Sequence, residues 1–263
     1  MTNIHPTAII DPSAEIDSSV KIGAYSVIGA HVKIAKDCNI HAHVVIEGRT
    51  TIGENCEIFS FACLGKAPQH LRYDGEPAEL IIGNNNIIRE HVTMHIGTAL
   101  GNMKTVIGNN GMFMASSHVA HDCIVGDNFI LAQNAALGGH CVVSDNVYFG
   151  AYSAAHQFVR IGHNAMIGGL TAVIADIIPY GNVFGERGHL QGLNLIGMKR
   201  RGMAKSDIKF IKSAFDHIFL QDGVFQDNLA SAKTEFGDNQ AVKEMIDFIE
   251  QGGSRPLCVV KDK

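Results

Sequence analysis

The part of the chain best suited to chemistry is a series of histidines between residues 118 and 157. The chain has 14 histidines among 263 residues, and this stretch contains the segments SSHVAHD, LGGH and AAHQ. His121 directly precedes Asp122, and a carboxylate beside a histidine fixes the tautomer of the ring and raises its basicity. Such a pair can serve as a general base, and a nearby glycine N–H can stabilise an oxyanion. Together these groups would suit acyl transfer.

A six-residue repeat indicates how the fold brings these segments together. Every sixth residue from Ile4 to Leu64 is Ile or Leu, and apolar residues resume the spacing from Ile82 to Leu100 and from Ile107 to Val173. Neither a simple helix nor a simple strand has this period. Hexapeptide repeats instead indicate a parallel β-helix, whose stacked coils bury one continuous core. Three six-residue faces would close a prism with about 18 residues per coil and ~4.8 Å between coils.

This period predicts which distant residues lie above one another. Residue 139 follows residue 121 by one coil, and residue 156 follows residue 138 in the same way. We therefore expect His121, Gly139, His140 and His156 to cluster at one edge of the prism. The general base His121 and the N–H of Gly139 would then lie within ~5 Å of each other.

Each repeat also has one small inward position and often a glycine. Four of the six cysteines occupy the small position, and no C-x-x-C pair is present. These four (Cys38, Cys56, Cys123 and Cys141) are therefore predicted to be small core residues rather than disulfide or zinc ligands. Glycine commonly follows the aliphatic residue, as at Gly23 and Gly29, where we expect a corner conformation that other residues resist.

Breaks in the repeat predict loops and a domain boundary. The polar segment GKAPQHLRYDGEPAEL interrupts the spacing, so we expect an extruded loop near residues 65–81, with a degenerate coil as the alternative. A one-residue slip between Leu100 and Ile107 indicates a second, smaller excursion. The repeat stops near Pro179, and from about Met203 apolar residues share one face at helical spacing, namely Ile208, Ile211, Phe215, Ile218 and Phe219. We therefore predict a mainly β fold, with a β-helix over residues 1–190 and a small C-terminal α-helical domain over 191–263.

The composition excludes several classes of partner. A net charge of −5 gives no general attraction to nucleic acid. The N-terminus lacks a basic segment followed by an apolar one, and no stretch reaches the ~18 apolar residues of a membrane span. We expect a cytoplasmic protein without a membrane span.

Several motifs resemble one family of enzymes. The repeat array, SSHVAHDCIVGDN, LGGH, AAHQF and GLNLIGMKRRG before a helical region are similar to the UDP-N-acetylglucosamine O-acyltransferases that begin lipid A biosynthesis. The resemblance covers nearly the whole chain. It implies a homotrimer of left-handed β-helices with active sites between neighbouring prisms. It also implies transfer of an (R)-3-hydroxyacyl chain from the phosphopantetheine of acyl carrier protein to the sugar 3-hydroxyl, without a metal or a further cofactor.

The resemblance assigns roles to individual residues. His121 matches the general base, Asp122 the acid that orients it, and Gly139 the oxyanion donor. The implied substrate-binding residues are Gln69, His70, Arg72, His95, His118, His140, His156, Gln157, Asn194, Arg200 and Arg201, of which the last four hold the nucleotide or its phosphates. Arginine suits a pyrophosphate because its planar fork binds oxyanions in pairs. Lys199, Lys205, Lys209 and Lys212 are candidates for docking the acidic carrier protein.

Two positions bear on specificity. The family usually has Asp where this chain has His70, which can donate as well as accept a hydrogen bond, so a 3-amino sugar is an alternative acceptor. Gly169 lies where the family measures acyl length, and a glycine there favours a chain longer than ten carbons.

Three other classes remain open on the sequence. A γ-class carbonic anhydrase-like enzyme would bind zinc through His118, His121 and His140. The later N-acyltransferase of the same pathway has an additional N-terminal uridine-binding domain, whereas this repeat begins at Ile4. A purely structural β-helix would leave the histidine cluster without a purpose.

Overall fold

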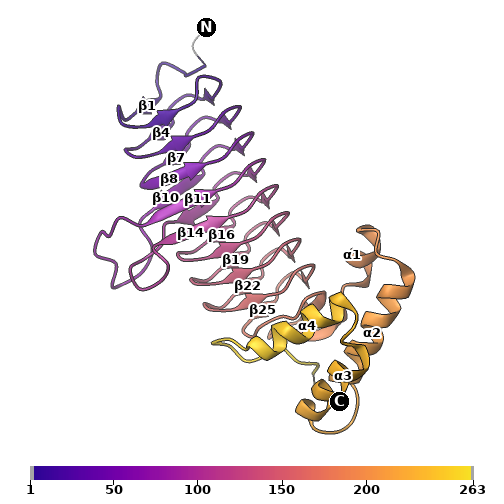
Figure 1. Cartoon of the computed structure of the whole chain (residues 1–263). Coiled ribbons are helices and arrows are strands. Elements are labelled where there is room, and N and C mark those ends of the chain that lie inside the picture. The colour runs from indigo at the N-terminus through magenta and orange to yellow at the C-terminus, as the bar shows by residue number, and fades with distance from the viewer. Residues whose placement is uncertain (1–2, 262–263) are drawn as a thin grey trace.

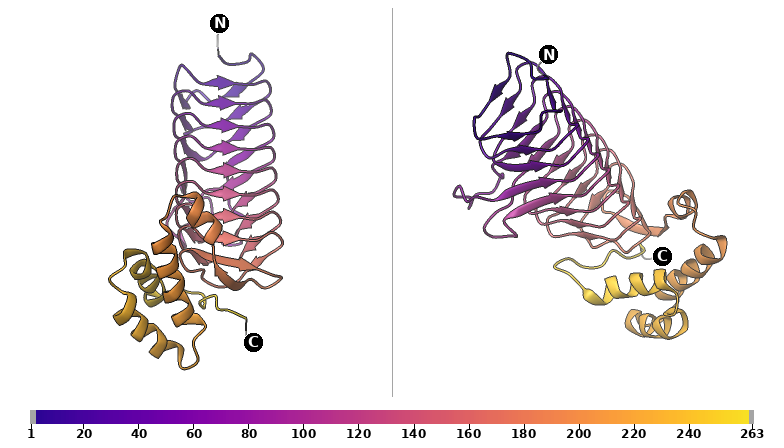
Figure 2. Two further views of the ribbon diagram at one scale, coloured as in Figure 1. Left: turned by 90° about the vertical axis from the view of Figure 1, so that its right-hand side faces the viewer. Right: turned by 45° about the horizontal axis from the view of Figure 1, so that its top comes forward.

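The computed structural model describes residues 3–261, and most of them form a three-faced parallel β-helix (Figures 1 and 2). The first face consists of β1 (Ile9–Ile10), β4 (Val27–Ile28), β7 (Val45–Ile46), β10 (Cys63–Lys66), β13 (Thr93–His95), β16 (His118–Val119), β19 (Ala136–Leu137), β22 (Ala154–Ala155) and β25 (Ala172–Val173). The second face consists of β2 (Glu15–Ile16), β5 (Lys33–Ile34), β8 (Arg49–Ile52), β11 (Glu79–Ile82), β14 (Lys104–Ile107), β17 (Ile124–Val125), β20 (Val142–Val143) and β23 (Arg160–Ile161). The third face consists of β3 (Lys21–Ile22), β6 (Asn39–Ile40), β9 (Glu57–Ile58), β12 (Ile87–Ile88), β15 (Met112–Phe113), β18 (Ile130–Leu131), β21 (Tyr148–Phe149), β24 (Met166–Ile167), β26 (Gly181–Phe184) and the antiparallel β27 (His189–Leu193).

The strand register confirms the predicted coil length. Ile9 pairs with Val27, 18 residues later, and the same offset recurs along most of the prism. Two coils are longer. Arg49 pairs with Glu79, and β12 pairs with β15 through Ile87 and Met112. The added residues form two loops, which we call loop A (residues 67–78) and loop B (residues 96–103).

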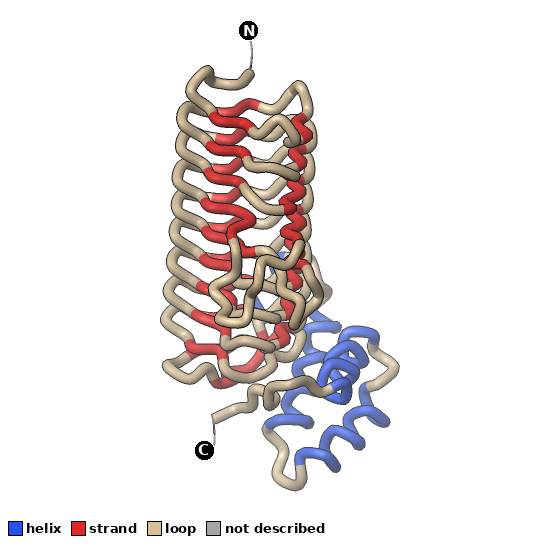
Figure 3. The backbone as a smooth tube through the Cα atoms, turned by 90° about the vertical axis from the view of Figure 1, so that its left-hand side faces the viewer, coloured by secondary structure: helices blue, strands red, loops and turns tan. Residues whose placement is uncertain are grey.

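Loop A projects from the prism between β10 and β11, and Figure 3 shows it as tan tube outside the strands. Loop B connects β13 to β14 on the next coil. Both loops therefore leave a first-face strand and return to the second face. We call the corner between these faces the first–second edge, and name the other two edges in the same way.

The aliphatic position of each repeat forms the core. Ile46, Leu64 and Phe113 have no exposed side-chain surface, and Ile28 is 1% exposed. The inward position predicted for the four cysteines is confirmed, because Cys38, Cys56, Cys123 and Cys141 are all buried as free thiols. Stacked aliphatic side chains thus hold the coils in register.

The prediction about the repeat glycines was wrong. Positive φ falls two residues after them, at non-glycine corners such as Tyr25 and His31. Gly23 is needed for another reason: a Cβ there would lie 2.5 Å from the backbone N of Ala42. Close approach of neighbouring coils, rather than a left-handed conformation, therefore selects glycine at this position.

Four helices follow the prism and lie at its C-terminal end (Figures 1 and 2). They are α1 (Leu195–Arg200), α2 (Lys205–Phe219), α3 (Phe225–Phe236) and α4 (Gln240–Gln251). The apolar face predicted after Met203 corresponds to α2, which buries Ile208, Ile211 and Phe215. Because β27 extends to Leu193, the β-sheet ends three residues beyond the boundary expected at 190. Within residues 3–261, each helix is too short or too polar to cross a bilayer.

Candidate active site

The first–second edge holds a buried histidine–carboxylate pair. His121 follows β16 and Asp122 precedes β17, so both lie at the corner between the two faces. His121 Nδ1 lies 2.8 Å from Asp122 Oδ2, and the two residues are 7% and 1% exposed. Since Nδ1 is engaged by the carboxylate, Nε2 is the nitrogen that remains for a substrate proton.

Loop B surrounds the Asp122 carboxylate with donors. Oδ1 accepts the backbone N–H groups of Thr98 and Asn102, each at 3.0 Å. Oδ2 accepts the Thr98 hydroxyl at 2.7 Å, in addition to the His121 ring. Burial raises the pKa of Asp122, but the hydrogen bonds from Thr98 and His121 outweigh burial, so the pKa is lower than that of an ordinary carboxyl. Asp122 is therefore ionised at neutral pH.

Gly139 lies against the ring of His121, one coil further on. A Cβ built on Gly139 would lie 2.6 Å from His121 Cε1 and 2.8 Å from Nε2. Among residues 3–261 no protein group accepts the Gly139 N–H. An unpaired backbone donor beside a general base is the arrangement that stabilises a tetrahedral oxyanion.

Four further histidines gather around this pair. The ring centroid of His140 lies 5.0 Å from that of His121, and the His70 ring of loop A lies 5.1 Å away on another side. The rings of His95 and His118 pack edge to face, with 4.8 Å between their centroids. The His118 ring also bonds the Thr93 hydroxyl at 2.7 Å. The structure thus brings together the histidines at 70, 95, 118, 121 and 140.

Burial keeps several of these rings neutral. Burial, together with His118 and His121, lowers the pKa of His95 to about 4. Burial also lowers the pKa of His118 and of His140, although Asp122 acts in the opposite direction on His140. Neutral rings can both donate and accept hydrogen bonds to a sugar.

We expect His95 to make the folded protein sensitive to acid. Its folded pKa of about 4 lies below the ordinary value of 6.5, so the unfolded chain binds the proton first, and stability present above pH 6.5 is lost as the pH falls towards 4. At pH 5 this loss is about 2 kcal/mol. Urea unfolding should show that the free energy of unfolding of wild type falls by about 2 kcal/mol more between pH 7.5 and pH 5 than that of His95→Asn does. Equal losses at one protein concentration would contradict the prediction.

His156 and Gln157 lie at the same edge, two coils beyond His121, and both are exposed. Arg255 from the C-terminal segment reaches them. Its Nε donates to the Gln157 carbonyl at 2.8 Å, and its Nη2 contacts His156 Nδ1. No sequence pattern pointed to Arg255, because a segment beyond the repeat has no predictable register.

The other predicted site residues lie at different edges of the prism. Asn194 caps α1, accepting the Gly197 N–H at 2.9 Å and donating to the Asn164 carbonyl. Arg201 donates to the side chain and carbonyl of Asn146, at the second–third edge. Arg200 is exposed at the end of the same helix.

Gly169 lies between β24 and β25, at the third–first edge. In loop A, Gln69 and Arg72 are exposed beside His70. Within one chain, the histidines and loop A therefore lie together at the first–second edge, whereas Asn194, Arg201 and Gly169 lie at other edges.

The cluster also resembles a metal site in composition. Donor atoms of His121, Asp122 and His140 lie within 4.8 Å of one another. This set replaces the predicted zinc ligand His118 with Asp122. Both Asp122 oxygens already accept hydrogen bonds from protein groups, so the carboxylate is arranged to hold His121 rather than to bind a cation.

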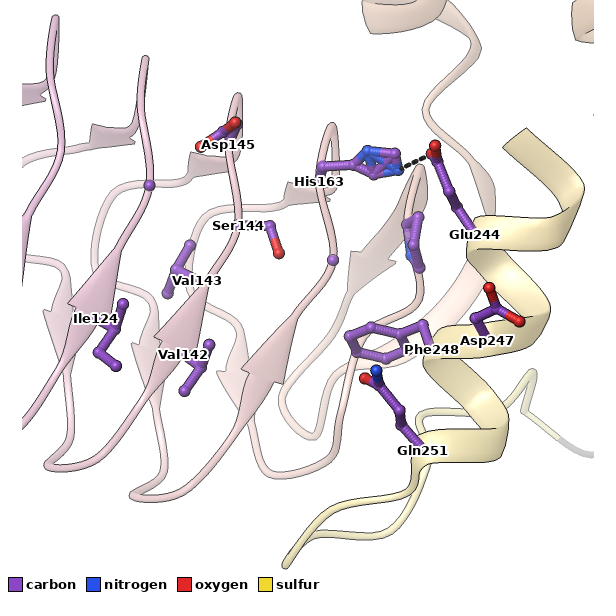
Figure 4. A pocket seen from close by; sticks show the side chains of 13 residues that line it. Ile124, Val142, Val143, Ser144, Asp145, His163, Glu244, Asp247, Phe248 and Gln251 are labelled. Carbon is purple, nitrogen blue, oxygen red and sulfur yellow. Dashed lines mark ion pairs between the residues drawn. The ribbon is translucent and has the colours of Figure 1, made fainter. Parts of the chain in front are cut away.

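A cavity of about 620 Å³ lies elsewhere, between the second face and α4 (Figure 4). Among the described residues, its lining includes none of the predicted site residues. His163 faces Glu244 of α4 across it, with 3.2 Å between His163 Nε2 and the carboxylate. The His163 ring also packs against the Tyr180 ring, with 4.7 Å between the ring centroids. His163 is thus a packing residue that joins the prism to α4.

Comparison with known proteins finds relatives that match over nearly the whole of both sequences. The chain is 51% identical over 257 residues to the acyl-[acyl-carrier-protein]–UDP-N-acetylglucosamine O-acyltransferase of Caulobacter vibrioides, covering 98% of both chains. It is 46% identical to the enzyme of that name from Rhizobium rhizogenes, covering 97% of this chain and 94% of the relative.

Solved structures agree with these relatives. The UDP-N-acetylglucosamine O-acyltransferase of Moraxella catarrhalis matches with a TM-score of 0.94 and 37% identity, over 97% of this chain and 99% of that one. The predicted left-handed parallel β-helix is thereby confirmed. A family model described as UDP-N-acetylglucosamine O-acyltransferase, domain 2, matches residues 176–258. The chain therefore belongs to the UDP-N-acetylglucosamine O-acyltransferase family.

Proposed function

We propose that this protein transfers an (R)-3-hydroxyacyl chain from acyl carrier protein to the 3-hydroxyl of UDP-N-acetylglucosamine, the first step of lipid A biosynthesis. The observation that carries the proposal is the contact of Gly139 with a buried His121–Asp122 pair. The printed names of the relatives supply the substrates. The geometry supplies a base and an oxyanion donor on one edge.

In the proposed reaction His121 Nε2 takes the proton from the sugar 3-hydroxyl as its oxygen attacks the thioester carbonyl. Asp122 stabilises the imidazolium that forms, because its ionised oxygen accepts the Nδ1–H. The Gly139 N–H stabilises the oxyanion of the tetrahedral intermediate. The intermediate then collapses, the C–S bond breaks, and the proton on His121 passes to the departing thiolate.

We propose that the active enzyme is a homotrimer with its sites between neighbouring prisms. Asn194, Arg200 and Arg201 would then hold the nucleotide or its phosphates across the cleft from the neighbour's histidines. The position of Asn194 and Arg201 on a different edge from His121 supports this arrangement. His156, Gln157 and His118 complete the proposed substrate contacts, and Gly169 would lie near the end of the acyl chain.

The carrier protein would dock on the helical part of the chain. Lys199 at the end of α1 and Lys205 and Lys209 on α2 are exposed. Lys212 is also exposed, but it forms an ion pair with Asp216 one turn later. A basic surface of this kind would attract an acidic partner and accelerate its association.

A mass-spectrometric assay of the purified protein tests reaction, acceptor and chain length together. We expect product from UDP-N-acetylglucosamine and an (R)-3-hydroxyacyl carrier protein, with the highest rate for a chain longer than ten carbons. Gly169 is the reason for this length, because it has no side chain to shorten the acyl channel. The 3-amino analogue of the sugar nucleotide should react more slowly.

Different outcomes would contradict different parts of the proposal. Absence of acyl product with every carrier protein in the series would contradict the function itself. Faster reaction of the 3-amino analogue would show that His70 selects another acceptor. Stoichiometric zinc whose removal abolishes turnover would favour the zinc-enzyme alternative.

A further inference from the structure

Loop B has a buried threonine that the proposed mechanism does not use. Thr98 is 1% exposed, and it contacts both oxygens of Asp122 at once. Its N–H donates to Oδ1 at 3.0 Å and its hydroxyl to Oδ2 at 2.7 Å. Two donors from one residue fix the rotation of a carboxylate, because each oxygen then has its own partner.

The shared oxygen connects Thr98 to the base. Asp122 Oδ2 accepts both the Thr98 hydroxyl and the His121 ring, the latter at 2.8 Å. The other end of Asp122 is held as well, since its N–H donates to the Thr105 hydroxyl at 2.8 Å. Rotation of the carboxylate away from His121 would therefore break the bonds to Thr98.

The backbone of loop B fits closely around the same group. A Cβ on Gly101 would lie 2.3 Å from Asp122 Cγ and 2.4 Å from Oδ1. Asn102 adds its N–H to Oδ1 at 3.0 Å. Glu76 of loop A accepts the Ala99 N–H at 2.8 Å, so the loop that carries His70 is tied to the loop that holds Asp122.

We propose that Thr98 is a positioning residue for acyl transfer, whose hydroxyl holds the Asp122 carboxylate in the orientation that sets His121 as the base. This role rests on the proposed function of His121. Thr98 acts only through Asp122 and touches neither substrate. Loop B interrupts the hexapeptide repeat, and in doing so it supplies the donors that hold Asp122. A regular coil would not supply these donors.

The pH dependence of turnover follows from the shared oxygen. Without the hydroxyl, the charge on Oδ2 is available to His121 alone, which favours the protonated, inactive ring. The acid limb of the kcat/KM profile should therefore move to higher pH. The other titratable groups near the pair are His70, His95, His118, His140, the buried Cys123 next to Asp122 and, through loop B, Glu76, and they remain unchanged.

Two substitutions of Thr98 separate the hydroxyl from the shape of the side chain. Thr98→Val keeps the volume and removes the donor, and it should lower kcat at least tenfold, with less than a threefold change in KM for UDP-N-acetylglucosamine. The acid limb of Thr98→Val should lie at least half a pH unit above that of wild type. Thr98→Ser retains the donor and should stay within threefold of wild type.

Thr50→Val is the matched control. Thr50 is fully buried in β8, three coils before the His121–Asp122 pair, and its hydroxyl donates to the Glu47 carbonyl at 2.6 Å without contacting either residue of the pair. This variant should retain wild-type kinetics although it loses a comparable buried hydrogen bond. Wild-type kinetics for Thr98→Val, or equal losses for Val and Ser at position 98, would overturn the proposal. Inactive wild type with every acyl carrier protein would instead contradict the proposed function.

Discussion

Replacement of His121 by alanine should lower kcat about a thousandfold and leave the protein folded. A positioned general base contributes about 10²–10⁴ in rate, and the buried pair with Asp122 places His121 towards the effective part of that range. The ring contributes little to the core, because it lies at the prism edge against Gly139 rather than in the aliphatic column. Steady-state kinetics with sedimentation analysis of the same samples would measure both quantities.

A histidine at the same edge gives the control. His31 lies between β4 and β5, at the first–second edge several coils before the site, and it is exposed with φ of 62°. Asparagine adopts this conformation readily, so His31→Asn should retain turnover and thermal stability. If His121→Ala kept more than a tenth of wild-type kcat, another group would have to remove the proton.

The repeat predicted the centre of the site because backbone hydrogen bonds fix the coil register. His140 N–H donates to the His121 carbonyl at 3.0 Å, which is the contact expected between residues one coil apart. Any pair separated by one period is therefore predictable from numbering alone. This is why His121, Gly139 and His140 could be grouped before their positions in space were known.

The loop B residues that hold Asp122 escaped prediction, also for a reason of register. Thr98 and Asn102 lie in the slip between Leu100 and Ile107 or next to it, where the period gives no register. The sequence indicated that the slip was an excursion, with Gly101 and Asn102 beside it. It could not indicate that the loop turns inward to Asp122, because that depends on hydrogen bonds formed only after folding.

Contacts between the prism and the C-terminal segments were equally inaccessible. Arg255 reaches His156 across 99 positions, and Arg160 bonds Asp176 and the Phe248 carbonyl. Helix packing on the end of the prism decides these partners, and periodicity carries no information about it. The hydrophobic face of α2 was predictable, but α3 was not, since its apolar residues form a weaker pattern after Asp222–Gly223.

Substitution of Gly139 by alanine should lower kcat at least a hundredfold while the protein stays folded. The added Cβ would lie 2.6 Å from Cε1 and 2.8 Å from Nε2 of His121. The ring can relieve this overlap only by swinging away, which breaks its 2.8 Å bond to Asp122. The base would then be misplaced, and the proposed oxyanion donor would be partly covered by a methyl group. Kinetics together with thermal denaturation would separate lost turnover from lost stability.

Gly29→Ala provides the comparison on the same edge. Gly29 follows β4 as Gly138 follows β19, so it lies one position before the register of Gly139 on the same edge. A Cβ at Gly29 meets its nearest atoms at 3.4 Å, and its φ is not positive. This variant should match wild type in both turnover and melting temperature. Near-normal turnover of Gly139→Ala would mean that the ring can move without losing its function, and the donor would then have to be sought elsewhere. A large fall in melting temperature for Gly139→Ala alone would instead assign this glycine to coil stacking, the role that Gly23 has.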